Sequence, residues 1–265
     1  MRNDQRLSGK TALVTGSAAG LGLAMGRALA DAGCRVVLHG LEPQASMQET
    51  CTELSRETGA EVLYRRADLA DPAAIAALMQ ALIGDFGGID VLVNNAVVRH
   101  IAPIDGYPVE HWDRALAVNL SAAFHTIRLA LPGMRLRRWG RIFNMSSVYG
   151  SRATAHRIDY VTTKSALLGM TRAVALEAAA DGITCNALCP GAVHTPGAEA
   201  RIRQLMAEQG IGHDEAVGLF LVGKQPSLRF VEAGHVAELL VFLCGAAGNE
   251  INGAMLPMEG GWLAG

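Results

Sequence analysis

Tyr160 and Lys164 stand four residues apart in the segment Asp-Tyr-Val-Thr-Thr-Lys-Ser-Ala-Leu. Residues at positions i and i+4 of a helix share one face, so a phenol and an ammonium group would project side by side. A phenol is a poor base at neutral pH, and a neighbouring cation stabilises its phenolate form. With only four Tyr and three Lys in the chain, such a pair is rare by chance. The spacing predicts a proton-transfer site, and an exposed helical pair is the alternative.

A glycine-rich turn follows the first apolar run of the chain. Three glycines have the spacing Gly-x3-Gly-x-Gly between a strand expected at residues 11–15 and a helix expected near 20–32. Glycine lets backbone N–H groups approach a diphosphate, and the positive end of a helix favours its charge. The turn predicts a dinucleotide site, unless its glycines serve the turn alone. The residues expected to line the site here are Gly16, Ser17, Gly20, Leu21 and Gly22.

Short apolar runs alternate with helical stretches along the whole chain. Strands are expected at residues 11–15, 35–39, 61–65, 89–94, 140–145, 183–188 and 254–258. Helices are expected near residues 20–32, 43–58, 72–86, 109–136, 159–180 and 231–245. Such alternation, with strands that are apolar on both faces, is typical of a doubly wound α/β fold. We expect one Rossmann-type domain over residues 1–265, with a mainly parallel seven-stranded sheet, helices on both faces and an active crevice at the carboxyl ends of the strands.

Residues 193–230 interrupt this alternation between the sixth and seventh strands. They contain helical patches near 197–208 and 213–222. An insertion that leaves from the active edge of the sheet suggests a lid over the substrate. A contact between subunits is the alternative use of such an insertion.

Composition and charge argue against several functions. The net charge of −2 offers no basic stripe, so nucleic acid is not expected as a partner. Five cysteines without zinc-type spacing are expected to be buried free thiols, and His100, His156 and His194 lack the spacing of a metal site. The polar N-terminal residues contain no apolar signal core, and no apolar stretch reaches membrane-spanning length. We therefore expect a cytoplasmic protein with no metal and no membrane partner.

The motifs of the chain resemble, in order and spacing, those of the short-chain dehydrogenase/reductase family. They are Thr15-Gly16-x3-Gly20-x-Gly22, Asn94-Asn95-Ala96, Asn119, Ser147, Tyr160-x3-Lys164, and Pro190-Gly191 followed by Thr195. Segments 119–125, 183–191, 224–231 and 259–262 are similar to those of the NAD-dependent D-3-hydroxybutyrate dehydrogenases. The resemblance covers nearly the whole chain.

The resemblance implies hydride transfer between a nicotinamide dinucleotide and a hydroxyl or carbonyl substrate. Tyr160 would be the general acid/base. Lys164 would stabilise the phenolate form of Tyr160 and bind the nicotinamide ribose. Ser147 would bind the substrate oxygen, and Asn119 would hold a water of a proton relay. Family likeness also implies a homotetramer. A 3-oxoacyl carrier-protein reductase, a sugar or polyol dehydrogenase and a non-catalytic dinucleotide sensor are the alternatives.

Cofactor choice is expected to depend on the end of the second strand. Gly40 occupies the position where an acidic residue would accept the adenosine ribose hydroxyls. No Arg or Lys follows it, Ala19 is not basic, and Glu42 would repel a 2′-phosphate, so NAD is favoured over NADP. Asp68 is expected to meet the adenine, or else only to begin a turn. The remaining cofactor residues that the resemblance implies are Leu69, Asn95, Tyr160, Lys164, Pro190, Gly191, Val193 and Thr195.

Two departures from the family pattern concern the substrate end of the site. Val97 replaces the glycine of Asn-Asn-Ala-Gly and adds bulk near the nicotinamide ribose. Where the hydroxybutyrate dehydrogenases have glutamine, histidine, lysine and glutamine, this chain aligns Arg99, Tyr149, Arg157 and Arg201. Guanidinium groups suit carboxylates and phosphates, so we expect a hydroxy acid or another anion that is larger or doubly charged. The alternative is that these arginines are solvated or paired with nearby carboxylates, namely Asp105, Asp159 or Glu199.

Overall fold

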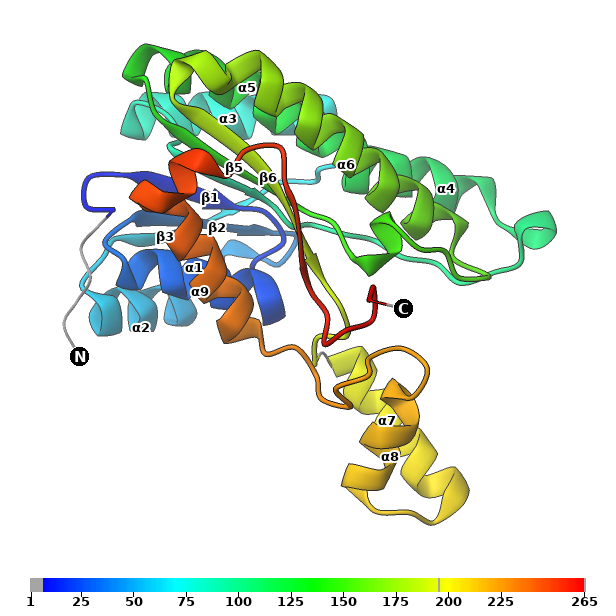
Figure 1. The fold of residues 1–265 in the computed structure, drawn as a ribbon. Coiled ribbons are helices and arrows are strands. Elements are labelled where there is room, and N and C mark those ends of the chain that lie inside the picture. Colours follow the sequence, from blue (N-terminus) through cyan, green and yellow to red (C-terminus); the bar gives the residue numbers. More distant parts are fainter. Residues whose placement is uncertain (1–6, 195, 265) are drawn as a thin grey trace.

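Seven strands form one parallel sheet in the computed structural model, which describes residues 7–194 and 196–264 (Figure 1). The strands are β1 (Thr11–Val14), β2 (Arg35–Gly40), β3 (Val62–Arg66), β4 (Val91–Asn94), β5 (Gly140–Met145), β6 (Ile183–Pro190) and β7 (Met255–Met258). Their order is β3-β2-β1-β4-β5-β6-β7, and every neighbouring pair is parallel. The strand order reverses between β1 and β4, which is where open α/β sheets form their ligand crevice. The predicted fold class is confirmed.

Helices cover both faces of the sheet (Figure 1). One face packs against α1 (Gly20–Asp31), α2 (Gln48–Thr58) and α9 (Ala233–Cys244), and the other against α3 (Pro72–Phe86), α5 (Ala122–Arg137) and α6 (Ile158–Ala178). Successive residues of β2 supply both layers, because Val36 and Leu38 belong to the first apolar core and Val37 to the second. All five cysteines are buried free thiols, as the sequence predicts. In the described part of the chain, none of the helices combines the length and apolarity needed to cross a membrane.

The helix expected at residues 109–136 is interrupted. α4 (Val109–Leu116) passes into a π turn (Ala117–Ser121) before α5 begins. The side chain of Asn119 lies in this turn, where it accepts from the Val98 N–H at 2.8 Å and donates to the Val98 carbonyl at 2.9 Å. These two bonds tie the turn to the segment that follows β4. A π turn often marks a functional site, and the apolar spacing on either side of it gives no sign of the change.

The insertion between β6 and α9 projects beyond the carboxyl ends of the strands (Figure 1). It contains α7 (Pro196–Gln209) and α8 (His213–Leu221), close to the helical patches that the sequence predicts. Ile202, Leu205 and Ala216 form an apolar cluster of their own, separate from the two cores of the sheet. The insertion is therefore an internally packed unit, which we call the lid.

The two stems of the lid are joined at its base. Val193 and Val231 pair as an isolated parallel bridge. The buried side chain of Gln225 accepts from the Ala192 N–H at 2.8 Å and donates to the Arg229 carbonyl. Because one amide contacts both stems, the base of the lid is held at a fixed width.

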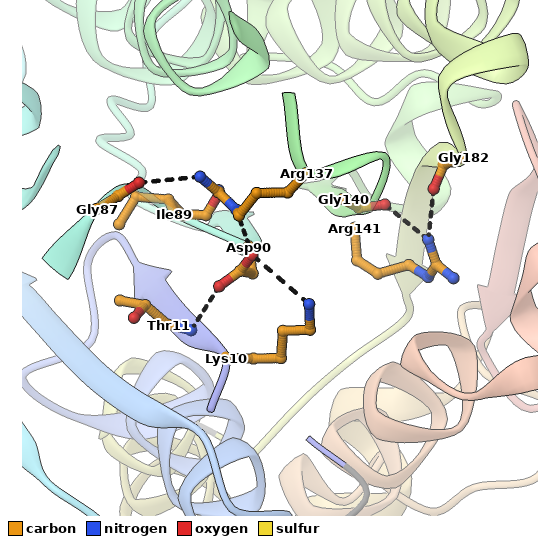
Figure 2. A network of polar contacts seen from close by, with 9 residues as sticks. All are labelled: Lys10, Thr11, Gly87, Ile89, Asp90, Arg137, Gly140, Arg141 and Gly182. Atoms are coloured by element: carbon orange, nitrogen blue, oxygen red, sulfur yellow. Dashed lines mark hydrogen bonds and ion pairs between the residues drawn. The ribbon is translucent and has the colours of Figure 1, made fainter. Parts of the chain in front are cut away.

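A buried carboxylate joins three elements at the amino ends of the strands, on the edge opposite the crevice (Figure 2). Asp90 accepts from the Thr11 N–H and from Arg137 Nε, both at 2.9 Å, and the Lys10 ammonium lies 3.9 Å away. Arg137 also donates at 2.9 Å to two carbonyls of the 87–89 turn. The network thus links β1, the start of β4 and the end of α5.

Replacing Asp90 by Ala is expected to lower the free energy of unfolding by about 3 kcal/mol, because the change leaves Arg137 without its carboxylate and the Thr11 N–H without an acceptor. Chemical denaturation at one fixed protein concentration measures this loss. Asp85→Ala is a matched control, since its ion pair with Arg65 is exposed and is worth about 0.5 kcal/mol or less. Equal losses in the two variants would show that the network adds no particular stability.

Candidate active site

The carboxyl ends of the strands border a cavity of about 1300 Å³. Ordinary small-molecule pockets have volumes of about 300–1000 Å³, so this cavity has room for a dinucleotide and a substrate together. The predicted residues in its wall are Gly16, Leu21, Gly22, Glu42, Asp68, Leu69, Asn95, Arg99, Ser147, Tyr149, Arg157, Tyr160, Lys164, Pro190, Gly191, Val193 and Arg201. Of the other predicted residues, Ser17, Gly20 and Asn119 are not in the wall, and Thr195 lies outside the described residues. Motifs far apart in the sequence therefore meet at one site.

The glycine turn presents the amino end of α1 to this cavity. Gly16 and Gly20 have φ values of +61° and +58°, a region that favours glycine. A Cβ atom on Gly22 would collide with the Gly16 carbonyl, so that position also requires glycine. The first turn of α1 has no side-chain cap and no acidic residue. Its N–H groups and the positive helix end therefore fit the diphosphate of the dinucleotide that the sequence predicts.

His39 lies buried beneath this turn, and the motifs do not point to it. Its Nδ1 accepts from the Gly16 N–H at 3.3 Å, and its Nε2 donates to the Ala67 carbonyl at 3.1 Å. Burial lowers the pKa of His39 to about 4, so the ring is neutral at physiological pH. Ser17 accepts from the His39 N–H at 2.9 Å and donates to the Val14 carbonyl at 2.7 Å. Ser17 thus supports the turn from beneath, and His39 joins the turn to the loop after β3.

The carboxylate of Glu42 lies where a side chain on Gly40 would begin. Tyr64 holds it there, because the Tyr64 hydroxyl lies 3.2 Å from this carboxylate and 3.0 Å from the Glu42 carbonyl. Burial and the charge of Glu42 raise the pKa of Tyr64 to about 12, so the phenol keeps its proton. Gly40 and Glu42 both line the cavity. An acidic group therefore stands at the end of β2 although Gly40 itself carries none.

Asp68 and Asn95 line the cavity on either side of the glycine turn. Asp68 also begins a turn, where it accepts from the Ala70 N–H at 2.9 Å and pairs with Arg114 at 3.3 Å. The Ala70 N–H and Arg114 lower the pKa of Asp68. The Asn95 amide donates to two carbonyls of the glycine turn at 3.0 and 2.8 Å. Asn95 therefore fixes the shape of the turn as well as forming part of the cavity wall.

Tyr160 and Lys164 lie at the start of α6, and both line the cavity. Lys164 Nζ is 5.5 Å from the centroid of the Tyr160 ring and donates to the Met145 carbonyl at 2.6 Å. The guanidinium carbon of Arg99 is 5.6 Å from the same centroid. Burial and the charge of Arg99 lower the pKa of Lys164 to about 7. A buried cation and an exposed cation therefore flank one phenol.

Ser147 and Asn119 occupy different positions relative to this phenol. Ser147 follows β5 and lies in the cavity wall, where its hydroxyl oxygen accepts from the Tyr149 N–H at 3.3 Å. Asn119 is buried, and besides its bonds to Val98 its side chain donates to the Thr163 hydroxyl at 3.4 Å. Because the Asn119 side chain is engaged, a water relay at this residue would have to use its backbone carbonyl.

Aromatic rings of Tyr149, Tyr160 and Trp262 line the cavity. The ring of Tyr149 packs edge-on against Tyr160, with centroids 6.2 Å apart, and against Trp262 at 5.4 Å. Trp262 comes from the segment after β7 and lines the cavity, although the sequence gives it no specific role. The segment from Pro190 to Val193 also lines the cavity, and so does Val97, which is 37% exposed.

Four cationic side chains also line the cavity, namely Arg99, Arg157, Arg201 and Lys224. Lys224 is the member that the sequence does not single out. Across residues 7–194 and 196–264, no carboxylate lies within ion-pair distance of Arg99, Arg157 or Lys224. Arg201 reaches Glu208 at 3.7 Å, and both side chains are half exposed.

Two of the three carboxylates that the sequence offers as partners of these arginines are engaged elsewhere. Asp159 is buried and accepts from the Tyr160 N–H at 2.6 Å. Glu199 pairs with His194 at 3.0 Å and with Arg203 at 2.9 Å. Neither of these two carboxylates neutralises the arginines of the cavity.

A parallel sheet with a turn that fits a dinucleotide, and a Tyr-Lys pair in the same cavity, define a nicotinamide dinucleotide-dependent oxidoreductase. Residues 10–205 match the model of the short chain dehydrogenase family. The chain belongs to this family and is an oxidoreductase that acts on CH–OH groups.

Known proteins resemble the chain over almost its full length. D-beta-hydroxybutyrate dehydrogenase of Cupriavidus necator is 41% identical over 258 residues, which cover 97% of this chain and 99% of that protein. The enzyme of the same name from Rhizobium meliloti is 40% identical and covers 96% of this chain and 99% of its own. The structure of L-sorbose reductase from Gluconobacter frateurii with NADPH and L-sorbose has a TM-score of 0.93 at 29% identity, over 99% of both chains. These matches confirm the resemblance that the motifs indicate.

Proposed function

We propose that this protein is an NAD-dependent dehydrogenase of an anionic hydroxy acid. The observation that carries the proposal is that four cationic side chains line the same cavity as the Tyr-Lys pair, and three of them have no carboxylate partner in the described chain. The hydroxybutyrate dehydrogenase relatives are named for a small hydroxy acid, which is the same class of substrate. A neutral sugar, such as the one bound by L-sorbose reductase, would leave these charges unpaired.

Each residue around the Tyr160 phenol has a separate role in binding the substrate oxygen or in moving its proton. Ser147 and Tyr160 bind the substrate oxygen, and Tyr160 takes the hydroxyl proton as the substrate is oxidised. Lys164 and Arg99 bring their cationic groups to 5.5 and 5.6 Å from the centroid of the Tyr160 ring. The bound dinucleotide supplies the hydride acceptor. The backbone carbonyl of Asn119 holds the water through which the proton reaches solvent.

Glu42 supports the choice of NAD. Its carboxylate stands beside Gly40 at the end of β2, where the adenosine ribose of a Rossmann-bound dinucleotide lies. A carboxylate accepts hydrogen bonds from the two ribose hydroxyls and repels a 2′-phosphate. Tyr64 holds Glu42 in this position.

Replacing Glu42 by Gln is expected to lower the ratio of kcat/KM for NAD⁺ to that for NADP⁺ by about tenfold, because the amide keeps the size of the side chain but removes the charge that repels phosphate. Initial rates on a panel of hydroxy acids and neutral polyols with each dinucleotide measure this ratio and the substrate class. Glu49→Gln, on the first turn of α2, is the control and should leave the ratio unchanged. A wild-type preference for NADP⁺ or for neutral polyols would overturn the proposal.

The proposal includes a homotetramer in the cytoplasm. Phe124 on α5 and Leu176 on α6 are large apolar side chains that the single chain leaves exposed, and so is Leu136 near the end of α5. Burying them between helices of neighbouring subunits would remove this apolar surface from water.

A further inference from the structure

We infer that the substrate carries two anionic groups, one at each end, with the reacting hydroxyl closer to the group that Arg99 binds. The inference rests on the proposed function, because it assigns a substrate class to the same site. Four cations line the substrate end, and they fall into two groups by their contacts. The chemical class is a hydroxy dicarboxylate.

The first group is Arg99 beside the phenol. Its guanidinium carbon lies 5.6 Å from the centroid of the Tyr160 ring. The Tyr160 hydroxyl must come within hydrogen-bond reach of the reacting oxygen. An anionic group that contacts Arg99 is therefore attached close to the carbon that changes oxidation state, as in a 2-hydroxy or 3-hydroxy acid.

The second group is Arg157, Arg201 and Lys224, which come from the residue before α6, from α7 and from the segment after α8. Lys224 donates to the Phe220 carbonyl at 2.9 Å, and its ammonium lies 4.2 Å from the centroid of the Phe220 ring. All three side chains line the same cavity, and burial and the charges of Arg157 and Arg201 lower the pKa of Lys224. An anion bound among them would relieve their mutual repulsion.

One carboxylate cannot satisfy both groups. A guanidinium fork uses two parallel hydrogen bonds, and a carboxylate offers about four acceptor sites, so one carboxylate is saturated by two such partners. Arg201 is only weakly compensated, because its pair with Glu208 is long and exposed. A second carboxylate on the substrate would occupy the cations of the lid while the first occupies Arg99.

Matched pairs of substrates test this inference. Malate and 2-hydroxyglutarate are each compared with the half methyl ester that keeps the carboxylate nearer the hydroxyl, and 3-hydroxybutyrate serves as a monoanion. We expect kcat/KM for the preferred dicarboxylate to exceed that for its half ester by about tenfold or more. Equal or higher values for the half ester in every pair would overturn the inference and leave the proposed hydroxy-acid activity standing.

Variants of the lid locate the second anionic group. Lys224→Met should lower the ratio of kcat/KM for the dicarboxylate to that for its half ester by about tenfold. Lys224→Arg keeps the charge and should keep the preference. Arg203→Met is the matched control, because Arg203 lies on α7, is exposed and pairs with Glu199 instead of lining the cavity. An equal effect of Lys224→Met on both substrates would contradict the assignment.

A binding measurement separates failure of the inference from failure of the proposed function. Quenching of bound NADH fluorescence by glutarate and by its monomethyl ester reports affinity without turnover. Tighter binding of glutarate, abolished by Lys224→Met, supports the inference even when a given hydroxy acid is a poor substrate. If glutarate binds no more tightly than its half ester, the two-anion site does not exist. If no hydroxy acid is oxidised with either dinucleotide, the proposed function itself is wrong.

Discussion

Replacing Tyr160 by Phe is expected to lower kcat by about three orders of magnitude while the affinity for NADH changes by less than about twofold. The variant removes the hydroxyl that exchanges the proton. It keeps the ring that packs against Tyr149 and lies near Lys164 and Arg99. The cavity wall around the dinucleotide is therefore preserved. Steady-state rates and fluorescence titration with NADH measure the two quantities.

Tyr149→Phe is the matched control for this experiment. Tyr149 is a second phenol in the same cavity, and its ring contacts Tyr160 and Trp262. Among the described residues, Arg99 and Lys164 lie near the Tyr160 ring, whereas no cation lies comparably close to the Tyr149 ring. We expect Tyr149→Phe to reduce kcat by less than about tenfold, because Tyr149 contributes to binding and not to proton transfer. Near wild-type turnover in Tyr160→Phe would refute the assignment of the general acid/base.

Replacing Lys164 by Met is expected to lower kcat by about two to three orders of magnitude and to stabilise the cofactor-free protein at low pH. Lys164 is buried, and burial with the charge of Arg99 lowers its pKa from 10.5 to about 7. Below pH 7 the folded protein must hold the buried charge, so the destabilisation is greatest there. Between pH 7 and 10.5 the unfolded chain binds more protons than the folded one, and the destabilisation fades as the pH rises.

Thermal unfolding of the cofactor-free protein at pH 6 and pH 10 tests this sign. The Met variant should have a midpoint about 2–4 °C above wild type at pH 6, and the gain should shrink at pH 10. Tyr160→Phe is the control, because it alters the same site without removing the buried ammonium. A midpoint below wild type at pH 6 would mean that the Lys164 bond to the Met145 carbonyl outweighs the burial of the charge.

The fold could be predicted from the sequence because its signals are local. β5 coincides with the expected run, since it begins at Gly140 and its neighbours Ile142 and Phe143 enter the apolar cores on opposite faces. β6 continues to Pro190, beyond the expected end, because its ladder with β7 continues to the pair Pro190 and Met258. The π turn at Asn119 escaped prediction for the opposite reason. It depends on hydrogen bonds to Val98, and the spacing of apolar residues does not record such bonds.

The residues of the candidate site likewise divide into those that local sequence predicts and those that it does not. Tyr160 and Lys164 are four residues apart on one helix, so local geometry was enough to place them together. Lys224, His39 and Glu42 owe their positions to tertiary contacts. Lys224 lines the cavity because the chain returns to the base of the lid after α8. Glu42 stands near the end of β2 because Tyr64 of β3 holds it. A single sequence carries no direct signal for either contact.

The separate apolar cluster of the lid has an evolutionary consequence. Ile202, Leu205 and Ala216 pack with one another and not with the sheet, so the lid keeps its shape when side chains on its cavity side change. Substitutions at positions such as Arg201 and Lys224 can then accumulate without disturbing the half of the protein that binds the dinucleotide. A descendant of this chain could evolve to act on different substrates while its redox chemistry stays the same.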